Sequence, residues 1–250
     1  MRALHSIFYV NTGFILLYFT TNVFAKNSCE FDVKVKQVLL NEGFHRNITY
    51  GIVFNTEDED DDWLYKDCIV AIDQTLPSGV YANPDEMEEF RRNHKLNAIP
   101  KNRINIELPT EQSEPSSVYV LGKIKQNKVN LWVPVHARYH KAVAGGGSAR
   151  NEIEAPKLYL RCPDQRLDLC DKNVLPPVTF LCNGSSKEKC SWKKIPFTML
   201  TDTLIWDVPV GDLEHYYAVA LGTALVVVSG SVYLLQAAHD FKAGRVRKAL

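Results

Sequence analysis

The sequence predicts an all-β domain of the sandwich type, closed by disulfide bonds and followed by one transmembrane helix near the carboxyl end. Three observations carry this prediction. Many short segments alternate apolar and polar residues, which is the period of a half-buried strand. All six cysteines lie before residue 200, and an uncharged run extends over residues 216–238. At 1.5 Å per residue this run covers roughly 34 Å, enough for a hydrocarbon core of about 30 Å.

Residues 1–25 have the pattern of a secretory signal peptide. A short basic start, Met1-Arg2, precedes an apolar block at residues 14–19, and small residues, Val23 and Ala25, occupy the −3 and −1 positions of a cleavage site. We therefore expect cleavage after Ala25 and entry of the chain into the secretory pathway.

The charges that flank the apolar run predict its orientation. Acidic residues precede residues 216–238, whereas Lys242, Arg245 and Arg247 follow them. Because basic residues next to a span stay in the cytosol, we expect a type I protein with a luminal domain at residues 26–213 and a cytosolic tail at 239–250. The final Arg-Lys pair is either a dibasic retrieval signal of the endoplasmic reticulum or ordinary cytosolic charge.

The luminal part consists mainly of predicted strands, bounded by turn residues as in an all-β sandwich of one domain or two half-domains. The predicted strands are residues 29–38, 47–54, 68–72, 103–108, 118–121, 128–135, 157–162 and 178–182. One segment, residues 84–92, predicts a helix, because proline and acids suit its first turn and arginines its last. Residues 57–62, 109–117 and 145–148 are predicted to be surface loops.

The cysteines predict up to three disulfide bonds, since an even number in an oxidising compartment favours bridges. They are Cys29, Cys68, Cys162, Cys170, Cys182 and Cys190, and their connectivity stays open among 15 possibilities. Zinc ligation usually needs closer spacing within each pair than these cysteines have. Two sequons, which begin at Asn47 and Asn183, are predicted glycosylation sites in the same compartment.

The charge balance bears on the partners of the chain. With 29 basic and 29 acidic residues the net charge is zero, so the chain has no basic surplus for phosphates and we expect no nucleic-acid partner. Six consecutive acids at residues 57–62 allow a metal site or the Asp-x-Asp of a nucleotide-sugar transferase. A solvated, self-repelling loop is the favoured interpretation, because no glycine supplies a turn that would bring the oxygens together.

The densest polar cluster is His136, Arg138, Tyr139 and His140. The two histidines have the spacing of zinc ligands on a helical turn, but the alternation before them predicts extended chain and no metalloprotease glutamate follows. We expect a structural or interface motif here. The sequence contains no nucleophile elbow and no phosphate-binding loop, so we expect no catalytic residues, no metal and no cofactor.

Three segments resemble the PIG-X family. They are residues 76–81 (Leu-Pro-Ser-Gly-Val-Tyr), residues 134–140 (Pro-Val-His-Ala-Arg-Tyr-His) and residues 152–162, which end in Tyr-Leu-Arg-Cys. The resemblance covers most of the luminal part and the span. It implies a non-catalytic subunit in the endoplasmic reticulum membrane that binds and stabilises PIG-M, the catalytic subunit of glycosylphosphatidylinositol (GPI) mannosyltransferase I, which adds the first mannose of the GPI anchor. The acidic run and the glycine-rich loop are not features of this family.

Two alternatives stay open. A cell-surface receptor or adhesion domain of the immunoglobulin type would require a Cys…Trp…Cys core, and no Trp lies between Cys162 and Cys182. A cargo-sorting membrane protein would show a heptad coiled coil before the span, and the sequence has none. Immature, endoglycosidase-sensitive glycans would distinguish a resident protein of the endoplasmic reticulum from the first alternative.

Overall fold

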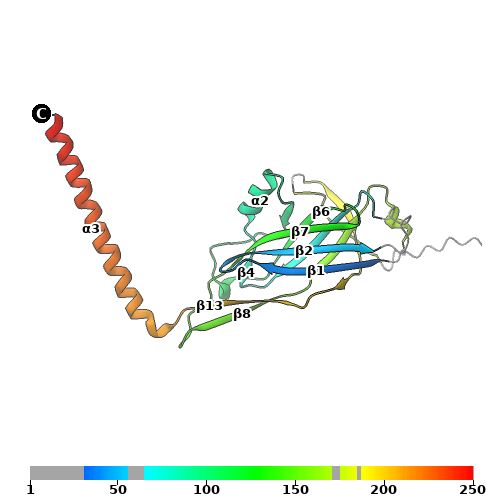
Figure 1. The fold of residues 1–250 in the computed structure, drawn as a ribbon, viewed down its shortest axis with the longest axis horizontal. Coiled ribbons are helices and arrows are strands. Elements are labelled where there is room, and N and C mark those ends of the chain that lie inside the picture. Colours follow the sequence, from blue (N-terminus) through cyan, green and yellow to red (C-terminus); the bar gives the residue numbers. More distant parts are fainter. Residues whose placement is uncertain (1–30, 56–64, 171–174, 185–186, 250) are drawn as a thin grey trace, which may run out of the picture.

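The fold is a β sandwich with a long helix at its carboxyl end (Figure 1). The computed structural model describes residues 31–55, 65–170, 175–184 and 187–249. We call the part before the long helix the β domain. The signal peptide, the acidic run and Cys29 lie outside the described residues.

Sheet A has five strands, and all but one of its neighbouring pairs are antiparallel. In spatial order they are β12 (Thr198–Met199), β1 (Asp32–Leu40), β2 (His45–Asn55), β7 (Lys128–Ala137) and β4 (Val80–Tyr81). β1, β2 and β7 show the predicted alternation, since every second side chain is buried. The buried side chains of these strands form the half of the hydrophobic core that sheet A contributes.

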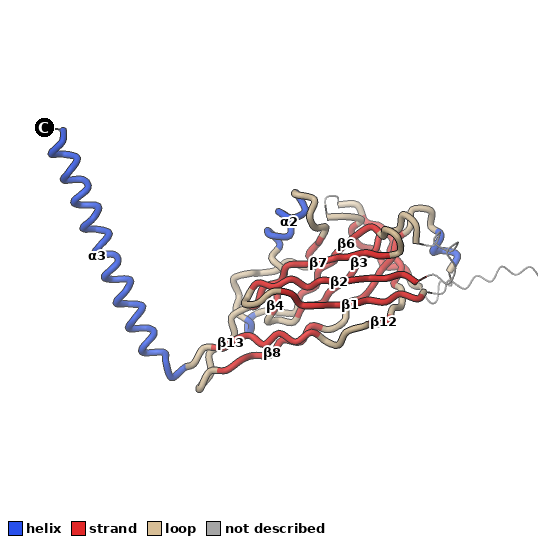
Figure 2. Tube along the Cα trace, viewed as in Figure 1, coloured by secondary structure: helices blue, strands red, loops and turns tan. Residues whose placement is uncertain are grey.

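Sheet B has six strands and lies against sheet A (Figure 2). Its spatial order is β10 (Pro177–Leu181), β11 (Lys189–Lys194), β9 (Lys157–Arg161), β3 (Ile69–Leu76), β6 (Ser116–Lys123) and β5 (Ala98–Pro100). A separate two-stranded sheet pairs β8 (Gly147–Ile153) with β13 (Leu204–Val210). Among the described residues, three 3-10 turns complete the β domain and the connection that leaves it: η2 (Thr110–Gln112), η3 (Arg166–Leu169) and η4 (Leu213–His215).

One hydrophobic core joins the two large sheets. Val35 and Ile48 of sheet A and Val70 and Ile72 of sheet B are buried in the same cluster. The prediction of a β sandwich is therefore confirmed, because residues of both sheets share this core.

The predicted helix is confirmed with its predicted bounds as α2 (Pro84–Arg92). The Asn83 side chain accepts a hydrogen bond from the Asp85 backbone N–H at 3.0 Å and caps the first turn. Phe90 contacts Trp132 of β7 edge-on, with ring centroids 5.1 Å apart. This contact holds α2 against the outer face of sheet A.

The prediction of a strand at residues 103–108 is wrong. This segment alternates in sequence, but it is irregular in the structure and pairs with no described strand. The carbonyl groups of Ile106 and Leu108 accept hydrogen bonds from the Arg138 guanidinium instead of from a strand. Alternation alone therefore could not distinguish a strand from an extended loop whose backbone is satisfied by a side chain.

The predicted loop at residues 145–148 is wrong at its end, because β8 begins at Gly147. Gly147 and Ser148 pair with Val210 and Pro209 of β13. β4, β5, β8, β11, β12 and β13 were absent from the sequence prediction. The loop predicted at residues 109–117 holds through η2, and β6 begins at its last residues.

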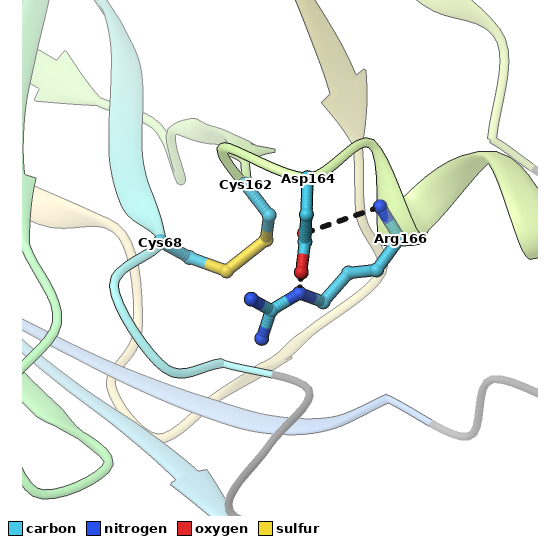
Figure 3. The surroundings of a disulfide bond; sticks show 4 residues. All are labelled: Cys68, Cys162, Asp164 and Arg166. Atoms are coloured by element: carbon cyan, nitrogen blue, oxygen red, sulfur yellow. Dashed lines mark hydrogen bonds and ion pairs between the residues drawn. A yellow bond between two sulfur atoms is a disulfide. The ribbon is translucent and has the colours of Figure 1, made fainter.

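Two disulfide bonds lie within the described residues. Cys68–Cys162 joins the segment before β3 to the end of the neighbouring β9, and Arg166 donates to the Asp164 carboxylate beside it (Figure 3). Cys182–Cys190 closes the β10–β11 hairpin. Cys170 is also disulfide-bonded, so the prediction of a disulfide framework is confirmed for these five cysteines.

The β10–β11 hairpin lies across the outer face of sheet B. Its backbone pairing with β9 runs through Lys193 and Lys194. Phe180 stacks between Tyr119 of β6, at 4.2 Å between ring centroids, and Trp192 of β11, at 4.7 Å. We call these three rings the aromatic stack. The hairpin thereby covers apolar side chains that would otherwise face solvent.

The carboxyl-terminal helix, α3 (Tyr216–Ala249), contains the predicted span. Residues 213–242 form a segment that is long and apolar enough to cross a membrane. The most apolar part of this segment is not buried against the β domain. α3 extends away from the sandwich (Figure 1). An apolar helix whose side chains at residues 216–242 are all exposed fits a membrane environment.

Candidate functional site

Segments that are far apart in the sequence meet at one end of sheet A, where β7 ends beside the short strand β4. Val80 and Tyr81 of β4 pair with Ala137 and His136 of β7. Just beyond β7, the Arg138 backbone N–H donates to the Gly79 carbonyl at 2.8 Å. The first two segments that carry the family resemblance are therefore side by side in the fold. We call Gly79, Tyr81, Arg138, His140 and Asn151 the motif junction.

Arg138 is a structural residue of the junction. It is 6% exposed, and its guanidinium lies 4.5 Å from the centre of the Tyr81 ring. Its Nη1 donates to the Leu108 carbonyl at 2.7 Å. Burial lowers the pKa of Arg138 from its usual value, and the nearby Tyr81 opposes this shift. Arg138 therefore fixes the 101–109 loop against β4 and β7 rather than facing a partner.

Gly79, His140 and Asn151 fit closely together. The Asn151 side-chain amide lies 3.2 Å from His140 Nε2 and 3.4 Å from the Trp206 carbonyl. A Cβ atom on Gly79 would lie 2.0 Å from Asn151 Oδ1, so no side chain fits there without a shift. Burial lowers the pKa of His140, and Glu111 opposes this shift. The neutral imidazole is therefore the favoured form in the folded protein.

Tyr139 points the other way from its neighbours. It is 79% exposed, and its ring lies 5.7 Å from that of Phe44, which is 38% exposed. Leu40, at the end of β1, is also exposed. We call Leu40, Phe44 and Tyr139 the aromatic tip. Such amphipathic rings are enriched in protein interfaces, where they supply large contact areas.

The loop that follows the aromatic tip reaches the segment before α3. Val143, four residues after Tyr139, forms a bridge with Asp212, and the Leu213 backbone N–H donates to the Val143 carbonyl at 3.0 Å. The Thr110 N–H donates to the Tyr139 carbonyl at 3.0 Å. These contacts connect the loop after β7 to the segment that enters the apolar helix.

A second polar cluster lies on the outer face of sheet A. Glu86 contacts His136 Nε2 at 2.8 Å and His45 Nε2 at 3.2 Å. The ligand atoms of these three residues lie within 4.8 Å of one another, which is close enough to hold a metal ion. Cys182, Glu188 and Cys190 are equally close, but the two sulfurs form a disulfide and cannot act as thiolate ligands.

The structure separates the four residues that the sequence analysis grouped. His136 contacts Glu86, Arg138 contacts loop carbonyls, Tyr139 faces solvent and His140 contacts Asn151. His136 and His140 do not form the zinc-ligand pair that the sequence analysis considered and disfavoured. The cluster whose atoms are close enough to hold a metal ion contains His136, His45 of β2 and Glu86 of α2.

Sequence reasoning missed several residues of both sites: His45, Phe44, Glu86 and Asn151. Gly79 and Tyr81 lie in a segment that it singled out only for the family resemblance. The others depend on which strands pair, and pairing between distant strands leaves no trace in a single sequence.

The two predicted glycosylation sites stay predictions. Asn47 lies within β2, with a half-buried side chain, and Asn183 lies in the β10–β11 turn. The serine of the second sequon, Ser185, lies outside the described residues.

Fold and site together define a membrane-anchored β-sandwich protein with an exposed aromatic tip. The model of the family described as PIG-X / PBN1 matches residues 41–238 of the chain. The chain therefore belongs to the PIG-X / PBN1 family, as the three segments predicted.

Curated relatives cover nearly the same length. The human protein named "GPI alpha-1,4-mannosyltransferase I, stabilizing subunit" is 27% identical over 214 residues, which span 84% of this chain and 81% of the human one. Rat and mouse proteins of the same name are also 27% identical over 214 residues, spanning 83% and 82% of their lengths.

Proposed function

We propose that this chain is a non-catalytic subunit of GPI mannosyltransferase I that binds and stabilises the catalytic subunit PIG-M in the endoplasmic reticulum membrane. Membership of the PIG-X / PBN1 family is the observation that carries the proposal. The relatives are named as stabilising subunits of this enzyme. The architecture is consistent with that role, since the chain combines a stable domain, an exposed aromatic tip and an apolar helix.

The flanking charges support a luminal position for the β domain and a cytosolic end for α3. In this orientation the aromatic tip faces luminal loops of the catalytic subunit, and α3 lies within reach of its transmembrane helices. A partner that binds only the native enzyme stabilises it by mass action, at about 2.7 kcal/mol when the partner concentration is 100 times the Kd.

The test replaces the tip without disturbing the fold. In cells that lack the endogenous subunit, Tyr139→Ala combined with Phe44→Ala should lower the amount of catalytic subunit several-fold, because about 1–2 kcal/mol of lost stabilisation changes abundance to that extent. Immunoblots of both subunits and a microsomal mannosyl-transfer assay measure the effect. Transfer per molecule of catalytic subunit should stay constant.

Leu200→Ala is the matched control, because Leu200 is exposed just after the edge strand β12, where its backbone N–H donates to the Val35 carbonyl of β1. It should leave both subunits at normal abundance. Arg138→Ala should lower the amount of this chain itself, since Arg138 is buried in the junction. A normal amount of catalytic subunit with no mannosyl transfer in the tip variant would contradict a purely stabilising role.

A further inference from the structure

The two histidines that contact Glu86 are neighbours on adjacent strands, on the same face of sheet A. His45, the first residue of β2, is the direct cross-strand partner of His136 in β7. Their rings are stacked, with centroids 4.3 Å apart and planes inclined by 16°. Glu86, in the first turn of α2, contacts each ring with a different carboxylate oxygen. Three elements thus bring three nitrogen and oxygen donors to one point on the surface.

We propose that His45, Glu86 and His136 bind one Zn²⁺ ion, through Nε2 of each histidine and the Glu86 carboxylate. In a tetrahedral site with zinc–ligand distances near 2.1 Å, ligand atoms lie about 3.4 Å apart. The observed contacts are 2.8 Å and 3.2 Å. Because the two imidazole planes are inclined by only 16°, their Nε2 lone pairs do not yet converge, so the half-exposed His45 ring must turn out of the stack to reach an ion bound by His136 and Glu86. The two hydrogen bonds to Glu86 are then replaced by metal–ligand bonds.

Two of the three donors, His136 and Glu86, are held in place by their surroundings. The Tyr81 ring stacks on His136, with centroids 5.3 Å apart. α2 is fixed by the buried Met87 and by the contact of Phe90 with Trp132. Among the ion pairs of the described residues, Glu86 contacts only these two histidines. A carboxylate with no lysine or arginine partner at this position has an unfilled capacity for a cation.

The donor set favours zinc over the alkaline-earth ions. Imidazole suits zinc, copper and nickel, whereas calcium and magnesium require oxygen ligands. The His45 side chain is 54% exposed, so a water molecule could occupy the fourth position. The ion would then tie β2, β7 and α2 together next to the motif junction.

The experiment uses the full chain in detergent, purified without a histidine tag and freed of metal with a chelator. Co²⁺ serves as the spectroscopic probe, because it adopts zinc-like geometry and absorbs in the visible region. We expect one equivalent of Co²⁺ per chain with the intense bands of a tetrahedral site. One equivalent of Zn²⁺ should displace it, and millimolar Ca²⁺ or Mg²⁺ should not.

Three variants test the ligands separately: His45→Asn, Glu86→Gln and His136→Asn. Each should lower the Co²⁺ affinity by more than about tenfold, since even outer-shell changes cost that much. His45→Asn is the variant least able to disturb the fold, because the side chain is half exposed. His94→Asn is the matched control, since His94 is exposed just after α2 at φ 55°, a conformation that asparagine tolerates.

The outcomes separate clearly. Retained affinity in His94→Asn with loss in His45→Asn and Glu86→Gln supports the site, provided that circular dichroism shows all variants folded. A loss of Co²⁺ affinity in His136→Asn alone, accompanied by an altered circular dichroism spectrum, reflects misfolding and counts against the site. No tetrahedral Co²⁺ spectrum in the wild type, or equal binding by His45→Asn, overturns the proposal and leaves adventitious binding only.

Discussion

The aromatic stack and the aromatic tip use the same kind of side chain in opposite ways. In the stack, Phe180 lies flat between Tyr119 and Trp192, and Trp192 is fully buried. At the tip, Tyr139 and Phe44 touch each other but remain exposed. Two of the three rings of the stack belong to a disulfide-closed hairpin that packs them against Tyr119 of β6, whereas nothing in the described residues covers the tip.

This difference teaches how one domain separates stability from recognition. Rings that are covered within the chain contribute to the free energy of unfolding through buried area, about 25 cal/mol per Å². Rings that stay exposed contribute little to that free energy and remain available for a partner. Substitutions in the two regions should therefore act on different measurements, and the following predictions test this separation in order of expected size.

Trp192→Ala should have the largest effect on stability. Removing a fully buried tryptophan leaves a cavity beneath the hairpin, and such changes cost about 3–5 kcal/mol. Urea unfolding of the full chain in detergent measures the loss. Val178→Ala, on the same hairpin but exposed, is the control and should change the free energy of unfolding by less than about 0.5 kcal/mol. Equal effects of the two substitutions would show that the stack is not a core.

Gly79→Ala should destabilise the motif junction by about 1–3 kcal/mol, because an added methyl group there displaces a packed side chain. The new Cβ would collide with Asn151 Oδ1, and Asn151 is buried. Adding Asn151→Ala should recover part of the loss, measured as non-additivity in the double mutant. Gly51→Ala, where the nearest atom is 3.7 Å away, is the control. Full additivity would contradict the collision.

The smallest expected effect concerns His140 and is visible only in how the stability of the protein depends on pH. Its pKa is lowered in the folded protein by burial, so the unfolded chain binds more protons below the unfolded pKa, about 6.5. As the pH falls from 7 to 5, the His140 contribution to stability should be lost. Unfolding midpoints of the wild type should therefore drop more than those of His140→Gln. Parallel curves for both proteins would show that His140 does not titrate differently on folding.

The regular elements were the part of the fold that one sequence could predict. β1, β2, β7 and α2 carry complete patterns, because one face of each packs on the core and the other faces solvent. β8 and β13 escaped prediction. β8 begins in a glycine-rich stretch and β13 contains a proline, and both features suggest loops to a sequence-based argument.

The candidate sites were predictable only in part. The sequence analysis singled out the segment from His136 to His140, and the structure separates its side chains: His136 contacts Glu86, Arg138 contacts loop carbonyls and Tyr139 faces solvent. The partners of these residues come from β2, β4, α2 and β8, which are distant along the chain. Pairing register decided the outcome, and register is a property of the assembled sheet rather than of any one segment.

The short connection between β13 and α3 sets how far the β domain stands from the bilayer. Residues 211–215 would span at most about 18 Å if fully extended. Much of that reach is removed by η4 and by Asp212, which accepts hydrogen bonds from the backbone of Gly145 at 3.0 Å and Glu214 at 2.9 Å. The end of the β domain that carries Val143 and Asp212 is thus held next to the start of α3. With α3 placed in a membrane, this end of the domain lies at the membrane surface.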